Sequence, residues 1–266
     1  MARIIEERFK SIDSMLTTLA TRQNNKIMSS RDESITGDYD FTRTYSYEDA
    51  ENLVRNGDEE SYEMIKDAIK SINNVKSHIS IRRQIRNGVV GYAPNVPNAI
   101  MGLPNSMIYM DKVQMKSKTI SIIYSPCATS NYGSDELAKA GAVMLSAIKK
   151  LELMGYRIQL DLLFKFSICN DEIVRPTVRL KEYHEHLDLK KLAFPVVNPS
   201  MFRRFGFKWL ETCEGLTETR WCAFYGASSF DLEYEDSDSI FVSYYIIRGL
   251  DYDVDKLLET KFKDKK

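Results

Sequence analysis

The chain has 266 residues, of which 43% are hydrophobic and 28% are charged. This is the composition of a soluble globular protein with one large domain, or one domain with extensions. Lys+Arg 37 against Asp+Glu 38 gives a formal net charge of −1, which argues against a generally basic nucleic-acid surface. No apolar run approaches the roughly 18 residues that cross a bilayer, and the charges in MARIIEERFK do not suit a signal peptide. We therefore expect a cytoplasmic protein without membrane contacts.

Residues 3–25 have apolar side chains at steps of three or four, which share one face of a helix. They are Ile5, Phe9, Ile12, Leu16 and Leu19. A single amphipathic helix cannot be stable alone, so it packs either on the body of the protein or on a neighbouring subunit. Residues 26–40 are polar and rich in turn formers, and we interpret them as a linker.

Two short helices are predicted next. Ser46 is a good N-cap, and Gly57 ends the first of these helices. The second runs from about Ser61 past Ile72. Residues 86–118 then combine many glycines and prolines with apolar side chains, so regular structure is not expected there. This segment either covers a sheet edge or is a long functional loop lying over the protein.

From Thr119 the pattern becomes α/β. TISIIYS is a short apolar run typical of a buried parallel strand, and Ser134 is the expected cap of a long helix that ends at Gly155. The small residues around Gly141 predict a close approach of this helix to the sheet. YRIQLDLLFKFSI, EIVRPTVRLKEY and DSIFVSYYIIRG are predicted as further strands, and DVDKLLETKFK as a closing helix. Helices alternating with strands indicate a largely parallel sheet with helices on both faces.

The four cysteines form no C-x-x-C pair, so we expect free and mostly buried thiols. A His184-x-His186 pair could contribute two zinc ligands, but no third ligand follows at a suitable spacing, which favours a solvated loop. Asp161 is expected to face solvent, or to pair with Lys165 or Arg179 across the sheet.

The first predicted strand of this region, its loop, its helix and the following Gly-Tyr-Arg strand together resemble the first half of a von Willebrand factor A-like domain. In that fold the first strand ends in an Asp-x-Ser-x-Ser loop that binds magnesium. Here the matching positions are Ser125, Cys127 and Thr129. The resemblance thus implies a degenerate metal site, because Mg²⁺ prefers hard oxygen ligands including a carboxylate, and a thiol is soft. No cofactor is predicted, and Mg²⁺ is not favoured.

A second resemblance covers residues 38–212. It is carried by FTRTYSYEDAENLVRNGD, NVPNAIMGLPNSM, AGAVMLSAIKKLELMGYRIQL and LDLKKLAFPVVNPSMFRRFGFKWLE. These segments are similar to an uncharacterised family of bacteriophage proteins with a von Willebrand A-like, or otherwise Rossmann-like, core. The resemblance implies a phage origin, in the host cytoplasm or the virion, and supplies no catalytic residues.

Two arginine clusters are candidate binding sites. Arg203 and Arg204 stand among aromatic residues, and Arg82, Arg83 and Arg86 form a second basic run. Arginines beside aromatics can bind phosphate or stack on bases, although an amphipathic helix with a solvated charged face explains the same pattern. If both clusters lined one cleft, nucleic-acid binding would gain support.

The sequence therefore predicts a von Willebrand A-like α/β core over 119–266, a helical and irregular segment packed on it over 38–118, and a helical N-terminal extension over 1–37. No Walker A motif or G-x-S-x-G elbow is present. The leading hypothesis is a non-enzymatic phage protein that binds another protein, as a virion or assembly component or as an adaptor to a phage ATPase. Self-association through the N-terminal helix is one version of it. The alternative is a phage protein that binds or processes nucleic acid.

Overall fold

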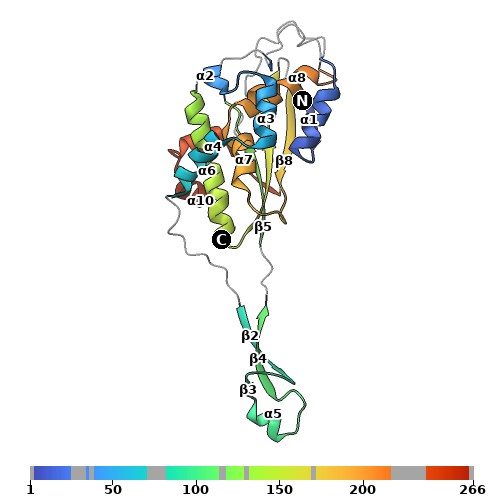
Figure 1. Cartoon of the computed structure of the whole chain (residues 1–266), viewed down its shortest axis with the longest axis vertical. Helices are drawn as coiled ribbons and strands as arrows, with labels where there is room; N and C mark the ends of the chain where they lie inside the picture. The colour runs from blue at the N-terminus through green and yellow to red at the C-terminus, as the bar shows by residue number, and fades with distance from the viewer. Residues whose placement is uncertain are drawn as a thin grey trace.

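The structure is a computed structural model of the chain. It describes residues 3–24, 34–35, 39–70, 82–113, 118–128, 132–168, 172–216 and 238–263. For residues 3, 82–84, 111–113, 167–168 and 172 only the backbone is described. Figure 1 shows a body of helices around a sheet, and a smaller unit that projects from one end of the body.

A six-stranded sheet forms the centre of the body, in the order β1-β8-β6-β5-β9, with β7 paired to β8. Its strands are β1 (Arg3–Phe9), β5 (Thr119–Ser125), β6 (Arg157–Leu163), β7 (Phe166–Ile168), β8 (Glu172–Lys181) and β9 (Ser239–Ser243). β5 is parallel to β6 and β9, and β1 is parallel to β8. β8 is antiparallel to β6 and β7. The predicted α/β fold, with a mostly parallel sheet flanked by helices, is confirmed at this level.

The helices of the body are α1 (Ile12–Thr21), α2 (Tyr39–Thr42), α3 (Tyr47–Asn56), α4 (Glu59–Lys70), α6 (Ser134–Leu153), α7 (Leu189–Val197), the π-helix η1 (Met201–Gly206), α8 (Phe207–Thr212), α9 (Tyr244–Gly249) and α10 (Val254–Lys261). Several boundaries follow the predicted caps. Ser46 accepts a hydrogen bond from the Asp49 N–H at the start of α3, and Gly57 ends that helix with a positive φ of 99°. At α6 the N-cap is Gly133, one residue before the predicted Ser134.

The N-terminal segment is a strand followed by a helix, so the prediction of one helix over 3–25 was wrong. Ile5 and Phe9 are four residues apart, a spacing that fits the period of a strand as well as that of a helix. Ser11 then caps α1, whose apolar face is buried on the body. Because β1 is a strand of the main sheet and the apolar face of α1 is buried on the body, the N-terminal segment is part of the core.

One face of the sheet supplies the hydrophobic core. Tyr124, Leu162 and Val178 are neighbours in register on β5, β6 and β8, and all three belong to one core cluster. Residues of α1, α6, α7, α8, α9 and α10 belong to the same cluster. Figure 1 accordingly shows α6 and α10 near β5, and α1 near β8. All of these helices therefore contribute to a single core.

The opposite face of the sheet carries a paired polar network beside the buried side chains of Ile123 and Leu163. The Asp161 carboxylate pairs with the Arg179 guanidinium, which confirms one of the predicted partners. The Gln159 amide donates to the Ser121 hydroxyl over 3.2 Å, and the Ser239 hydroxyl donates to the same oxygen over 2.9 Å. This hydrogen-bonded chain crosses four strands and satisfies its own polar groups, as buried polar networks must.

Gly141 of α6 lies against α7. The sequence had suggested a close approach to the sheet instead. A Cβ at this position would lie 2.2 Å from the carbonyl oxygen of Val196 and 2.8 Å from the Cα of Val197. Only glycine therefore permits this approach of the two helix backbones. α6 is buried along most of its length, which makes it the central helix of the body.

The last predicted strand is divided. Residues 239–243 form β9, and Ser243 then caps α9, because its hydroxyl accepts from the Ile246 N–H over 3.3 Å. The apolar run SIFVSYYII gives no sign of this switch except for that serine. The closing helix is confirmed as α10. His184 and His186 lie in the exposed loop between β8 and α7, as favoured by the sequence.

Residues 82–113 form a separate three-stranded antiparallel sheet with the order β2-β4-β3. Its elements are β2 (Arg82–Gly88), β3 (Ala93–Pro94), α5 (Val96–Ile100) and β4 (Met107–Val113). This unit, which we call the arm, lies between α4 and β5 in the sequence. It projects away from the body (Figure 1). The expectation of an irregular segment packed on the core was wrong here, because glycine and proline mark the turns of a hairpin unit.

Candidate functional site

The carboxyl end of β5 is where sheets of this kind often bind ligands, because β5 lies between strands connected in opposite directions. Ser125 and Cys127 are buried there, and Thr129 lies outside the described residues. The Cys127 thiol donates to the Leu163 carbonyl, 3.8 Å away, and accepts from the Lys165 N–H over 3.4 Å. Burial raises the pKa of this thiol to about 12. Cys127 is therefore a neutral thiol at ordinary pH.

These residues do not fit a magnesium ion. The chemistry needs hard, preferably anionic oxygen ligands, and Cys127 offers a neutral sulfur enclosed by backbone groups. No cluster of three or more histidine, cysteine or acidic residues able to hold a metal occurs in the described ranges. The loop after β5 thus has the place of a ligand site without the ligand set.

Side chains of the body enclose the space beside this loop. A small cavity is lined by Pro126 and Ala128 of the loop together with Phe41 and Arg203. The Arg203 guanidinium lies over the ring of Phe41, 4.7 Å from its centroid, and over that of Phe207 at 5.1 Å. These cation–π contacts fix Arg203 between Phe41 of α2 and Phe207 of α8.

Arg204, the second predicted arginine of this cluster, is fully buried. Its guanidinium donates to the carbonyls of Thr44 (2.8 Å), Ile35 (2.9 Å) and Ser34 (3.1 Å). The Glu211 carboxylate accepts from the backbone N–H of the same Ser34 over 2.9 Å. Arg204 and Glu211 together fasten the segment before α3 to η1 and α8, so the contacts of Arg204 serve the fold.

The two arginine clusters do not meet in one cleft. Arg82, Arg83 and Arg86 are in β2 of the arm, whereas Arg203 and Arg204 belong to η1, which leads directly into α8 at the far end of the body (Figure 1). In the arm, the register places Arg83 opposite Lys112 and Arg86 opposite Tyr109. The base of the arm is therefore a basic stem, formed by Arg82, Arg83, Arg86 and Lys112, with Asp111 as its one acidic residue.

The tip of the arm, residues 87–110, contains no charged side chain. Its shape is held by backbone contacts and amide caps. Gly91 is pressed against β4, since a Cβ there would lie 2.2 Å from the Ile108 carbonyl oxygen. The Asn95 side chain caps α5, and the Asn98 amide donates to the Asn105 carbonyl over 3.2 Å. The tip is thus an ordered platform.

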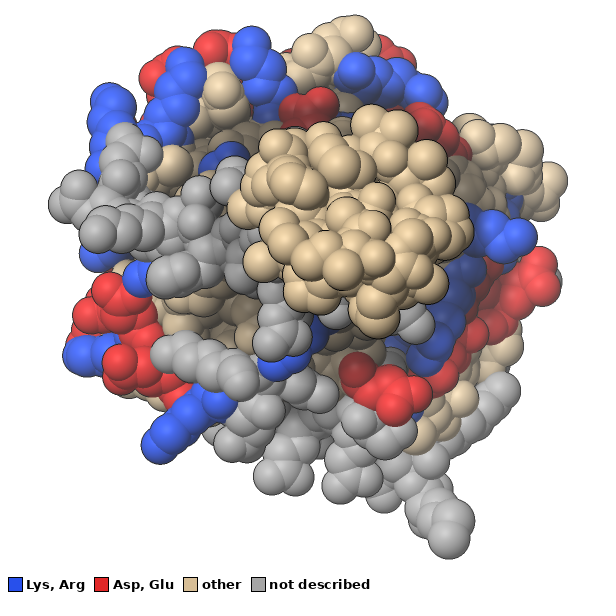
Figure 2. Space-filling view, turned by 90° about the horizontal axis from the view of Figure 1, so that it is seen from below, with Lys and Arg blue, Asp and Glu red and all other residues tan. Residues whose placement is uncertain are grey.

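Apolar side chains cover this platform and face solvent. Val90 and Ile100 are each 81% exposed. The others are Ile85, Val89, Tyr92, Val96, Met101, Leu103 and Met110. Between residues 85 and 110 no side chain is classed as buried. Figure 2, which views the molecule from the arm's end, shows the tip as an uncharged cap in front of a body surface that carries both charges.

The sequence predicted this segment to be either a cover over a sheet edge or a long functional loop. The usable signal for an apolar docking surface was the long uncharged run between Arg86 and Asp111, since an apolar segment with no charged residue needs either a core or a partner. The other predicted binding regions were the N-terminal helix and the two arginine clusters, one of which lies in β2 of the arm.

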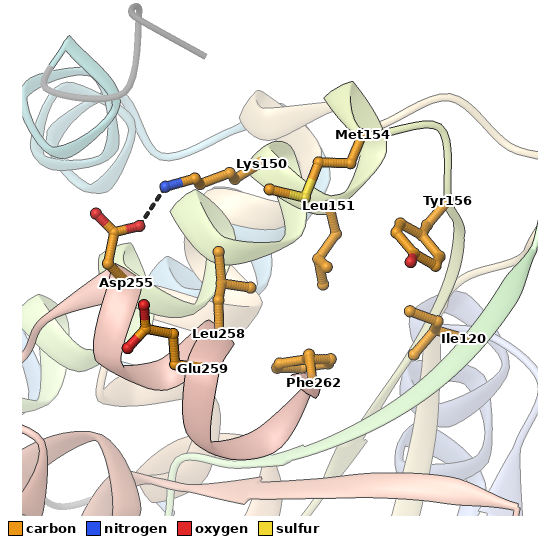
Figure 3. Close-up of a pocket in the computed structure, with 9 residues that line it drawn as sticks. All are labelled: Ile120, Lys150, Leu151, Met154, Tyr156, Asp255, Leu258, Glu259 and Phe262. Atoms are coloured by element: carbon orange, nitrogen blue, oxygen red, sulfur yellow. Dashed lines mark hydrogen bonds and ion pairs between the residues drawn. The ribbon is translucent and has the colours of Figure 1, made fainter. Parts of the chain in front are cut away.

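A second feature of the body is a small apolar cleft. It lies between the start of β5, the last turns of α6, and α10 (Figure 3). Its apolar walls are Ile120, Leu151, Met154, Tyr156, Leu258 and Phe262. Lys150 and Asp255 form an ion pair at one side, and the carboxylate of Glu259 lies beside them (Figure 3).

Residues 2–261 match the family model described as "Domain of unknown function (DUF7192)". No curated protein and no solved structure matches the chain. Among the described residues, no helix combines the length and hydropathy that a membrane span requires.

Proposed function

We propose that this chain, which belongs to the DUF7192 family of unknown function, is a non-enzymatic protein that binds another protein through the tip of its arm. The proposal rests on the distribution of exposed apolar side chains over the surface. Nine of the thirteen large hydrophobic residues exposed on the described surface belong to the arm. Contiguous apolar patches of this kind mark interaction sites.

The architecture of the arm supports the same proposal. A small antiparallel unit without a core is marginally stable in water, and none of the tip side chains is buried. A protein partner would cover the apolar side chains and supply the missing core. The ordered turn around α5 presents them in a fixed arrangement, which reduces the entropy lost on binding.

For the body we propose a von Willebrand A-like scaffold without an ion. The order β5, loop, α6, β6 agrees with the resemblance seen in the sequence, and Ser125 stands at the carboxyl end of β5 where that fold has its first ligand. The phage origin rests on the sequence resemblance. A virion or assembly component in the host cytoplasm, or an adaptor to a phage ATPase, is the setting that we propose.

The alternative is binding of nucleic acid by the basic stem. One observation favours it: Arg83 and Lys112 are direct partners across two strands, and like charges in opposed positions are unfavourable unless an anion lies nearby. This alternative predicts salt-sensitive binding to DNA or RNA. No affinity for either at about 50 mM salt would exclude it, because phosphate contacts are strongest at low salt.

The proposed function is tested by placing a photoreactive residue at position 100 of the full chain in the producing cell. The matched control carries it at position 45, where Tyr45 is 75% exposed on the body. We expect discrete protein adducts from position 100, and their loss when Met101→Asp is added. Position 45 should give none of these adducts.

Adducts that form equally from both positions would contradict a docking role for the tip. Adducts with lipid or nucleic acid from position 100 would contradict a protein partner.

A further inference from the structure

The three-stranded sheet of the arm has two edges, and only one of them suits another strand. β4 is the central strand, with β2 on one side and β3 on the other. β3 has two residues, of which Pro94 has no N–H to donate, and α5 begins at Val96 directly afterwards. β2 has seven residues and, within the described part of the chain, pairs with β4 alone. β2 is therefore the edge at which this sheet can be extended.

The hydrogen bonds of β4 show which backbone groups of β2 point outward. The Tyr92 N–H donates to the Ile108 carbonyl over 2.9 Å, so the backbone groups of Ile108 face away from β2. Ile108 is the register partner of Asn87, and in an antiparallel pair of this type the groups of both residues point away from each other. By alternation, the N–H and C=O groups of Ile85 and Asn87 point away from β4, whereas those of Arg86 face it.

The outward edge of β2 is open to solvent. Residues 85–87 are all exposed, and Ile85 is 66% exposed. A strand edge with a row of N–H and C=O groups on its open side is a template for a further strand. Only an extended backbone presents donors and acceptors at the matching spacing, so the edge itself specifies the conformation of its occupant.

The side chains beside this edge specify the chemistry of the occupant. Ile85 lies opposite Met110, and Asn87 lies opposite Ile108, so these four side chains share one face of the arm. Ile85 and Met110 are both largely exposed on that face. A strand added beside β2 would place every second side chain next to them. The matching segment is therefore apolar at alternate positions.

We infer that the protein partner contributes an extended segment, apolar at alternate positions, that pairs with the outer edge of β2 as a fourth strand of the arm sheet. This inference rests on the proposed function and states how the partner is held. The backbone bonds would give affinity and the alternate side chains specificity. The fourth strand would also stabilise a small sheet that has no buried core of its own.

Other occupants fit this edge less well. The backbone groups of a helix are already bonded within the helix, and a lipid tail has no groups that could pair with the N–H of Ile85. β2 contains three arginines and no carboxylate, so two copies paired along β2 would gather like charges at one seam. The edge therefore favours a segment of a different protein.

The first test is hydrogen exchange resolved to single residues, on the full chain recovered from the producing cell with its bound partners. The reference is the Met101→Asp chain, which loses the partner under the proposed function. In the reference, the amides of Ile85 and Asn87 should exchange faster than the amide of Arg86, because only Arg86 faces β4. In the wild type both outward amides should slow at least about tenfold, so that the alternation disappears.

The second test removes one outward donor. Ile85→Pro deletes that N–H and keeps the bonds to β4, since proline is tolerated on an edge strand. With the photoreactive residue at position 100, this variant should weaken partner binding at least about tenfold and lower the adduct yield accordingly. The control Ile85→Val keeps the N–H and removes one methylene, so it should lose much less.

Slow exchange of the Tyr109 amide, which faces β2, would show that the arm of the Ile85→Pro variant is intact. If that arm unfolds, the exchange comparison decides, because it needs no substitution in β2.

The inference is overturned if Ile85 and Asn87 exchange equally fast in the wild type and in Met101→Asp, or if an intact Ile85→Pro arm gives the wild-type adduct yield. If protein adducts nevertheless form from position 100, the partner contacts side chains alone, and the proposed function stands. If no protein adducts form from position 100, both the inference and the proposed function are wrong.

Discussion

Gly141→Ala provides a sharp test of how the body is packed. The new Cβ would lie 2.2 Å from the Val196 carbonyl oxygen and 2.9 Å from its carbonyl carbon. Ordinary contact distances begin near 3.4 Å, so α7 must move by more than 1 Å at this point, because backbone atoms cannot turn aside as a side chain does. Overpacking of a close-packed core typically costs about 1–3 kcal/mol, and a backbone clash lies at or above the upper end of that range.

The substitution also brings a gain, since alanine favours the helix by about 1 kcal/mol over glycine. The expected net loss is therefore about 2 kcal/mol or more in the free energy of unfolding. For a chain of this size that corresponds to a fall of roughly 4–8 °C in the thermal unfolding midpoint, which differential scanning calorimetry can measure.

The matched control is Gly249→Ala at the end of α9, where a Cβ would meet nothing within 4 Å. This variant should leave the midpoint unchanged or raise it slightly. If Gly141→Ala is as stable as the wild type, or gains stability as the control does, the close contact between α6 and α7 does not exist.

Two further predictions concern buried polar groups. In urea unfolding, Arg204→Met should lower the free energy of unfolding by about 3 kcal/mol or more, because it leaves the Ser34, Ile35 and Thr44 carbonyls without their donor. The control Arg55→Met, at an exposed ion pair, should change the free energy of unfolding by less than about 1 kcal/mol. Equal effects of the two variants would show that the Arg204 contacts carry no stability. Burial raises the pKa of Cys127 to about 12, against an ordinary 9.0. As pH rises, the thiol therefore ionises in the unfolded chain before it ionises in the folded one. The contribution of the neutral Cys127 thiol to stability is complete below about pH 9 and declines between pH 9 and 12. Cys127→Ala should therefore show a shallower alkaline loss of stability than the wild type, and native Cys127 should resist a thiol reagent at pH 8; rapid labelling of the native protein would contradict its burial.

The elements that the sequence predicted well are those whose ends carry a local signal. Ser46 and Gly57 frame α3 because a cap hydroxyl and a positive-φ glycine act within one turn. The α/β order after Thr119 was likewise readable from apolar runs and the long helix.

The failures arise where local patterns fit two structures. Ile5 and Phe9 suit a helix or a strand, and only the pairing of β1 with β8 decides between them. The run after Ser239 is equally apolar in β9 and α9. At the candidate site, the sequence identified Arg204 from its aromatic neighbours, but its burial depends on Ser34 and Thr44, which are more than a hundred residues away. The sequence placed Arg82, Arg83 and Arg86 of the arm among the candidate binding residues, but the exposure of the apolar side chains in the arm depends on the fold, which no local pattern reports.

The most direct test of the central claim is hydrogen exchange of the arm amides in the full chain, recovered from the producing cell together with its bound partners and compared between wild type and Ile100→Asp. If a protein surface covers the tip, residues 85–110 of the wild type should exchange more slowly than the same residues of the variant, and amides of α6 should be unaffected. Equal exchange of the arm in both recovered proteins would contradict the claim that the tip is a docking surface.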